Sequence, residues 1–150
     1  MKLVVETVIE APIERCFDLA RDISLHCRSA AHTGERAVAG VTEGLIGLGE
    51  SVTFEGVHFG VRQRLTSKIV EFDFPSRFVD EMTEGVFRSM KHIHEFQQSE
   101  RGTLMRDTLI WVSPFGVVGR LADWLFVSGH LRRFLVKRNA VLKEVAEGGT

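Results

Sequence analysis

A long region of alternating apolar and polar residues, followed by one long helical pattern, most constrains how this chain folds. Between residues 35 and 112, apolar residues recur mainly at every second position, which is typical of strands that bury one face. From 117 to 146 they recur at helical spacing instead. Several strands cannot all cover a single helix while they lie flat. The pattern therefore predicts an α+β fold in which a curved antiparallel sheet wraps a long C-terminal helix.

Turn residues divide these patterns into separate elements. An alternating stretch opens the chain, and Pro12 and Glu14 then suit the first turn of a short helix. Consecutive strands with short connections usually pair as antiparallel neighbours. The sequence predicts seven strands at 2–10, 35–42, 50–57, 60–72, 77–84, 88–98 and 103–112, with two short helices at 12–23 and 24–31 and the long helix at 117–146.

Composition and charge narrow the class of protein. A length of 150 residues fits one domain, predicted to span 1–150. The formal net charge of −1 argues against a nucleic-acid partner, which favours a basic surface. No run of apolar residues is long enough for a transmembrane segment, and the first twelve residues do not resemble a signal peptide. Because Cys16 and Cys27 form no C-x-x-C pair, we expect reduced thiols and a cytoplasmic location.

Three segments together resemble a known group of proteins. Residues 8–17 resemble the strand-to-helix opening of the SRPBCC superfamily, also called START-like. Residues 85–96, with the sequence GVFRSMKHIHEF, are similar to the G-x-F-R-x-x-x-H-x-H-x-F segment of one bacterial branch, as are 103–107 and 113–119. Where relatives of this branch tend to have an aromatic residue before the His-x-His, this chain has Met90.

The resemblance covers nearly the whole chain and implies the helix-grip fold. Members of the superfamily include carriers of lipids, hormones and quinones, polyketide cyclases and hydroxylase subunits. Members of this branch are often labelled polyketide cyclase/dehydrase. A fold of this kind hosts many activities, so the function has to be argued from the site.

Two histidines at adjacent inward positions form the centre of the predicted site. His92 and His94 lie two apart on a strand and therefore share one face. If the next turn runs from Ser99 to Gly102, His94 lies opposite Asp107. The same register pairs Phe96 with Met105, His92 with Leu109 and Met90 with Trp111, and the preceding hairpin brings the remaining polar residues close. The predicted polar patch, within an apolar concave wall, consists of Asp80, Arg88, His92, His94 and Asp107.

Three interpretations of this patch remain open. In the first, the patch is a network of buried hydrogen bonds in which every group has a partner. In the second, it anchors the polar head of a bound ligand. In the third, it carries out chemistry, either through a histidine base positioned by an aspartate or through a metal. The catalytic candidates are His92, His94, Asp107 and Asp80, and no metal or cofactor is predicted. The predicted ligand-binding residues are Met82, Arg88, Met90, His92, His94, Phe96, Met105, Asp107, Leu109, Trp111 and Trp124.

The sequence therefore predicts a protein that binds a small, largely apolar or amphipathic molecule, such as a lipid, quinone or polyketide, between the sheet and the C-terminal helix. The alternative is a cyclase- or dehydratase-type enzyme that uses a His/Asp pair for proton transfer. A homodimer and a weak contact with a membrane surface also remain open, the latter because 117–147 is rich in basic residues.

Several further side chains have two interpretations each. Basic residues such as Arg138 are expected on a solvated face of the long helix, while Trp124 and Phe134 close the pocket or, more simply, join the core. His58 faces either the cavity or a bulge. A surface role is the simpler one for His26, Cys27 and His32, which lie near a possible pocket mouth.

Overall fold

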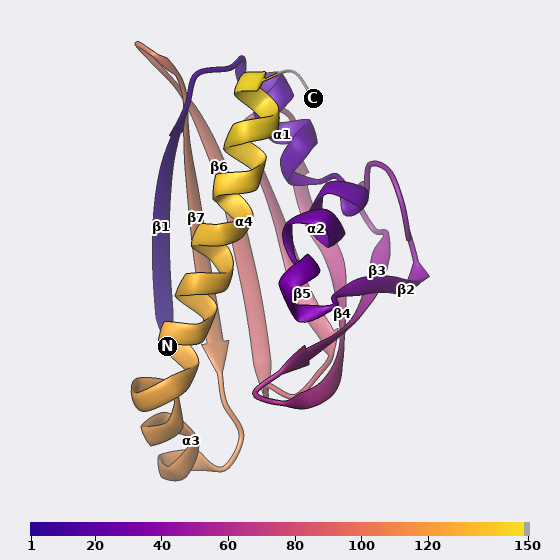
Figure 1. Ribbon diagram of the computed structural model, residues 1–150, viewed down its shortest axis with the longest axis vertical. Helices are drawn as coiled ribbons and strands as arrows, with labels where there is room; N and C mark the ends of the chain where they lie inside the picture. The colour runs from indigo at the N-terminus through magenta and orange to yellow at the C-terminus, as the bar shows by residue number, and fades with distance from the viewer. Residues whose placement is uncertain (149–150) are drawn as a thin grey trace.

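A computed structural model describes residues 1–148, so the last two residues of the predicted domain lie outside it. Its elements follow the predicted order of strand, two short helices, six strands and one long helical segment at the C-terminal side (Figure 1). The strands are β1 (Lys2–Ile9), β2 (Arg36–Gly40), β3 (Ser51–His58), β4 (Val61–Asp73), β5 (Arg77–Glu84), β6 (Ser89–Ser99) and β7 (Gly102–Val112). The helices are α1 (Ile13–Ala20), α2 (Ile23–Ser29), a 3-10 turn (Ala31–Thr33), α3 (Gly116–Ala122), a π-helical turn (Asp123–Val127) and α4 (Ser128–Gly148).

The seven strands form one antiparallel sheet in the order β1-β7-β6-β5-β4-β3-β2. The sheet curves around α4, while α1 and α2 close the side between β1 and β2 (Figure 1). This confirms the predicted α+β helix-grip architecture. The space between the concave face of the sheet and α4 is where a ligand site was expected.

The pairing of β6 with β7 follows the predicted register. His94 lies opposite Asp107 and His92 opposite Leu109, and Phe96 pairs with Met105 and Met90 with Trp111. On the other side of β6, Asp80 lies opposite His92. Alternation of side chains across the sheet then places the two histidines and both aspartates on the concave face.

The core at the upper end of the sheet in Figure 1 centres on Phe17 of α1, which is fully buried. Its ring meets Phe72, Phe74 and Phe78 edge-on, with centroids 5.0–5.2 Å apart. Burial of one such ring contributes about 1.5–3 kcal/mol. The guanidinium of Arg15 donates to the carbonyls of Val145 and Ala146 and ties α1 to the end of α4.

The predicted long helix is divided by the π-helical turn, and its first part extends beyond the sheet (Figure 1). As a result, Leu121 and Leu125, expected to lie near the apolar face of the helix, are 56% and 50% exposed. Arg138, expected on a solvated face, is buried instead. Within residues 1–148, no helix has both the length and the apolar character needed to cross a bilayer.

Candidate functional site

A cavity of about 230 Å³ lies between the concave face of the sheet and helices α2 and α4. This volume lies just below the usual range for small-molecule pockets, about 300–1,000 Å³. Most of its wall is apolar, including Ile69, Met90, Leu109, Leu131 and Leu135. The polar lining includes Ser67, Asp80, His92, His94 and Arg138, together with a second group of Glu35, His26, His58 and His130.

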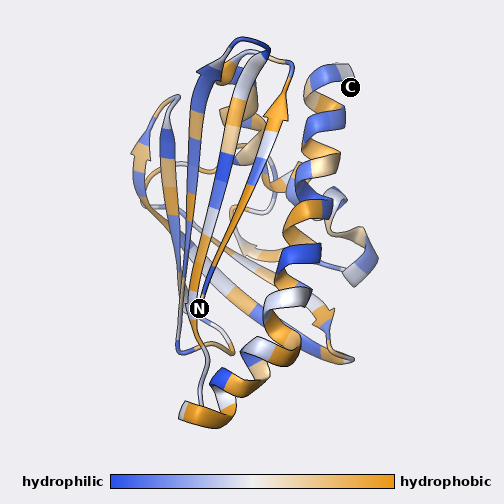
Figure 2. Cartoon of the chain, turned by 90° about the vertical axis from the view of Figure 1, so that its left-hand side faces the viewer, coloured by the Kyte–Doolittle hydropathy of each residue, from blue (hydrophilic) through white to orange (hydrophobic). Residues whose placement is uncertain are grey.

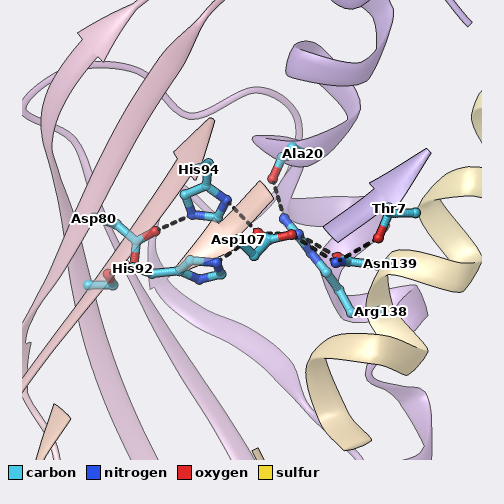
Figure 3. A network of polar contacts seen from close by, with 9 residues as sticks. Thr7, Ala20, Asp80, His92, His94, Asp107, Arg138 and Asn139 are labelled. Carbon is cyan, nitrogen blue, oxygen red and sulfur yellow. Dashed lines mark hydrogen bonds and ion pairs between the residues drawn. The ribbon is translucent and has the colours of Figure 1, made fainter. Parts of the chain in front are cut away.

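Asp107, fully buried at the middle of β7, connects the sheet to α4 (Figure 3). Its Oδ1 accepts hydrogen bonds from Nε2 of His92 at 2.8 Å and from Nη1 of Arg138 at 3.3 Å. Its Oδ2 accepts one from Nδ2 of Asn139 at 2.8 Å. Burial opposes the negative charge, but the hydrogen bond from His92 and the close approach of the His94 ring outweigh it and hold the pKa of Asp107 well below its usual value. Asp107 is therefore a carboxylate.

His94 lies between two carboxylates. Its Nε2 donates to Oδ2 of Asp80 at 2.7 Å, and Ser67 donates to the other oxygen of Asp80 at 2.8 Å. Its Nδ1 lies 3.4 Å from Oδ1 of Asp107, an ion-pair distance without hydrogen-bond geometry. Burial alone would lower the pKa of His94, but its interactions with Asp107 and Asp80 raise it. At Asp80, burial would raise the pKa, but the hydrogen bond from His94 outweighs burial and lowers the pKa of that carboxyl to about 2.

His92 stacks on His94 with ring centroids 3.7 Å apart. Burial and the neighbouring charge of His94 lower the pKa of His92, so its ring is neutral at neutral pH. Because Asp107 only accepts hydrogen bonds, Nε2 of His92 carries the proton and Nδ1 is the acceptor. Two carboxylates and the guanidinium of Arg138 therefore share the network with His94, whose raised pKa favours the charged ring.

A metal ion was not predicted at this site. Asp80, His92 and His94 each offer one ligand atom, and these atoms lie within 4.8 Å of one another. The two imidazole rings, however, are stacked at an interplanar angle of 23°. Nitrogen lone pairs lie in the ring plane, so nearly parallel rings direct them side by side rather than toward a common point. The arrangement fits hydrogen bonding better than coordination.

The predicted ligand-binding residues fall into three groups. Met90, His92, His94 and Leu109 line the cavity, as does the catalytic candidate Asp80. Four others are buried beside or behind its wall: Phe96, Met105, Asp107 and Trp111. The remaining three lie outside the lining: Met82 is half-buried beside Gly85, and Arg88 and Trp124 are exposed.

The placements of Arg88 and Trp124 correct two expectations. Arg88 precedes β6 and only its backbone N–H joins the sheet, by donating to the carbonyl of Val112, so it is not part of the polar patch. Trp124 is 73% exposed and belongs neither to the pocket lining nor to the core, because its helix extends beyond the sheet.

Sequence reasoning missed Ser67, Arg138 and Asn139. A signal for Arg138 was present, because Leu135, Arg138 and Leu142 recur at helical spacing and so share one buried face. Arg138 also donates to the carbonyl of Ala20 at 3.0 Å, which joins the network to the end of α1. No comparable pattern identifies Ser67, whose position depends on the pairing of β4 with β5.

A second polar group lies at the cavity mouth and includes His26 and His58. Glu35 accepts a hydrogen bond from His26 at 2.7 Å and lies 3.4 Å from Nε2 of His58. His58 in turn is hydrogen-bonded to His130 of α4 at 2.9 Å. Burial disfavours the Glu35 charge, but both histidines overcome this and lower the pKa of Glu35 to about 2. The expected surface role of His26 is therefore wrong, and His58 faces the cavity.

No protein-family model matches the chain, and no curated protein matches its sequence. Solved structures do match. TTHA0849 from Thermus thermophilus has a TM-score of 0.80 and 21% identity, over 100% of this chain and 99% of that chain. Ginseng major latex-like protein 151 from Panax ginseng has a TM-score of 0.72 and 14% identity, over 97% of each chain.

Protein CV1439 from Chromobacterium violaceum is similar, with a TM-score of 0.72 and 12% identity, over 97% of this chain and 96% of that chain. At such identities the likeness concerns the fold. It agrees with the strand order, the curved sheet and the C-terminal helix described above. The chain therefore has the helix-grip fold that these structures share.

Proposed function

We propose that the chain binds a small, largely apolar molecule that carries a neutral hydrogen-bond donor such as a hydroxyl group. The observation that carries this proposal is the composition of the cavity wall, in which apolar side chains surround His92 and its neighbours. Small-molecule pockets are usually built this way, with a few polar groups that fix orientation. The similar folds support a ligand-binding architecture in general.

The electrostatics of the polar network favour a neutral ligand head. Arg138 is already occupied by Asp107, Asn139 and the Ala20 carbonyl, so it offers little to an anion. Nδ1 of His92 accepts no hydrogen bond from the described residues, and a ligand hydroxyl or N–H group would supply one. Phenolic polyketides, sterols and other hydroxylated lipids have this chemistry, whereas an oxidised quinone has only acceptors. The cytoplasmic location remains a prediction from the cysteines.

Native mass spectrometry of freshly purified protein tests this function. We expect an additional mass of a small organic molecule that is lost on denaturation. Leu109→Arg places a charge inside the cavity wall and should abolish uptake, while Ile110→Arg, on the other face of β7, should retain it. Circular dichroism checks that both variants fold. A bare chain mass in the unmodified protein, or uptake retained by Leu109→Arg, would count against the proposed pocket.

The alternative function is an enzyme of the cyclase or dehydratase type. A specific geometry favours it: Asp107 holds His92 in one tautomer, and a neutral imidazole in a cavity is the usual form of a general base. His92→Gln should then abolish turnover of a bound substrate while binding stays within about tenfold. If this variant fails to fold and loses binding for that reason, the role of the histidine is structural.

A further inference from the structure

Large apolar side chains are exposed at one end of the molecule. Phe115 is 83% exposed, Trp124 73%, and Val117 and Val118 are both 71% exposed. Figure 2 shows this apolar end of α3 at the bottom of the molecule. Large apolar side chains exposed together at one end of a molecule often mark a contact with a protein or a membrane. We call it the apolar rim: Phe59, Val61, Phe115, Val117, Val118, Leu121, Trp124 and Leu125.

The outward orientation of α3 is fixed by buried contacts. At about 100° per residue, Val117, Val118 and Leu121 lie on one side of the helix, and Gly119 and Asp123 lie on the other. Asp123 is buried and accepts a hydrogen bond from Nε1 of Trp111 at 3.0 Å. The helix therefore has the reverse of the usual arrangement, with its apolar side held toward solvent.

Two phenylalanines of the rim adopt an unfavourable backbone conformation. In residues 1–148, the non-glycine residues with positive φ are Phe59, at 54°, and Phe115, at 69°. Phe59 begins the two-residue turn between β3 and β4, where Asn or Gly is strongly preferred. A bulky side chain that is 58% exposed gains little from folding at such a position. A role in binding accounts for it better than a role in stability.

The turn with Phe59 and the segment with α3 flank the cavity. The ring of Phe59 lies 4.5 Å from that of His130, near the start of α4. Phe59, Val127 and Leu131 all line the cavity. In Figure 1 the β3–β4 turn and α3 both lie at the lower end of the molecule. A surface that contacts the apolar rim would therefore meet the cavity mouth.

The charges around the rim identify the kind of surface. Residues 113–137 contain Arg120, Arg132, Arg133 and Lys137, all on the accessible side of the helices, and their single acidic residue, Asp123, is buried. On a two-fold dimer this cationic end would face its own copy and repel it. Trp and Phe side chains flanked by arginines suit the interface of an anionic bilayer. We propose that the apolar rim docks on membranes that contain anionic lipids, with the cavity mouth toward the bilayer.

Co-sedimentation with vesicles tests this proposal. We expect binding to vesicles of phosphatidylcholine mixed with phosphatidylglycerol, and weaker binding to phosphatidylcholine alone or at high salt. Because Trp111 is buried, a blue shift of tryptophan emission would report insertion of Trp124. Phe59→Asn, which suits the turn, and Trp124→Gln should each weaken binding by about tenfold. Leu48→Gln, at a 62% exposed leucine outside the rim, should leave it unchanged.

Three results would overturn the proposal. These are no binding to the mixed vesicles, binding that both rim variants retain, and a concentration-dependent dimer that the same variants disperse, because the rim would then cover a second copy. Leu109→Arg separates this inference from the proposed function. It should lose the cavity ligand and keep vesicle binding, since Leu109 lies inside the cavity wall and not in the rim.

Discussion

Asn139 donates a hydrogen bond from Nδ2 to Oδ2 of Asp107 over 2.8 Å, and thereby joins the middle of α4 to the middle of the sheet. Asp107 is the common acceptor for groups from β6 and α4. The carboxylate is fully buried, so water does not replace a lost partner. The network is therefore both a polar wall of the cavity and a structural connection between the sheet and the helix.

Replacement of Asp107 by Asn should destabilise the protein strongly. The variant keeps the shape of the side chain but removes the buried negative charge that pairs with Arg138. Removal of one partner of a buried pair typically costs about 3–5 kcal/mol. Urea unfolding gives the change in the free energy of unfolding. Glu6→Gln breaks a pair with Arg106 on the exposed face of β1 and β7 and should cost less than about 1 kcal/mol. Equal losses in the two variants would contradict the role assigned to Asp107.

How much the sequence could predict depended on the kind of interaction. Turn residues and alternation identified every strand, and the inward side of the histidines followed from the register of one hairpin, His94 opposite Asp107. The partners from α4 were missed, because the sequence does not show how far the sheet curls or which turn of the helix meets Asp107. Arg138 was placed on a solvated face because a charged residue is rarely buried unless it is paired.

The exposed helix α3 and the turn after it show a second limit of prediction from sequence. Trp124, Leu121 and Leu125 have the spacing and composition of a core helix, so a helical pattern predicts burial for them. In the structure, the sheet does not extend as far as α3. The π-helical turn lies between α3 and the buried part of α4. Apolar periodicity identifies an apolar face, but not whether the same chain covers it.

The carboxyl group of Glu35 should contribute a pH-dependent share of stability. Its pKa is lowered from 4.5 to about 2 in the folded protein, so its contribution is fully present above about pH 4.5 and is lost as the pH falls toward 2. Glu35→Gln removes this titration but retains an acceptor for His26. The difference in unfolding free energy between the unmodified protein and the variant should be largest at neutral pH and shrink between about pH 4.5 and pH 2. Urea unfolding over that range measures it, and a difference independent of pH would refute the assignment.

Two helical glycines provide a matched test of how α3 is held against the end of β7. A Cβ atom at Gly119 would lie 2.0 Å from the carbonyl oxygen of Pro114, so Gly119→Ala has to move the helix away from the preceding turn. We expect a loss of about 1–3 kcal/mol, as for other overpacked sites. A Cβ at Gly129 would approach only the flexible end of Arg133, at 3.3 Å. Gly129→Ala should therefore be neutral or stabilise the helix by about 0.5–1 kcal/mol.

The same pair of variants relates the packing of α3 to the proposed membrane contact. If close packing at Gly119 fixes the outward side of α3, Gly119→Ala should weaken vesicle binding as well as lower the urea midpoint, because Val117, Val118 and Leu121 would no longer be held toward the bilayer. Gly129→Ala leaves that geometry intact and should bind vesicles like the unmodified protein. A lower midpoint with unchanged vesicle binding would mean that the apolar side of α3 needs no fixed orientation to reach the membrane.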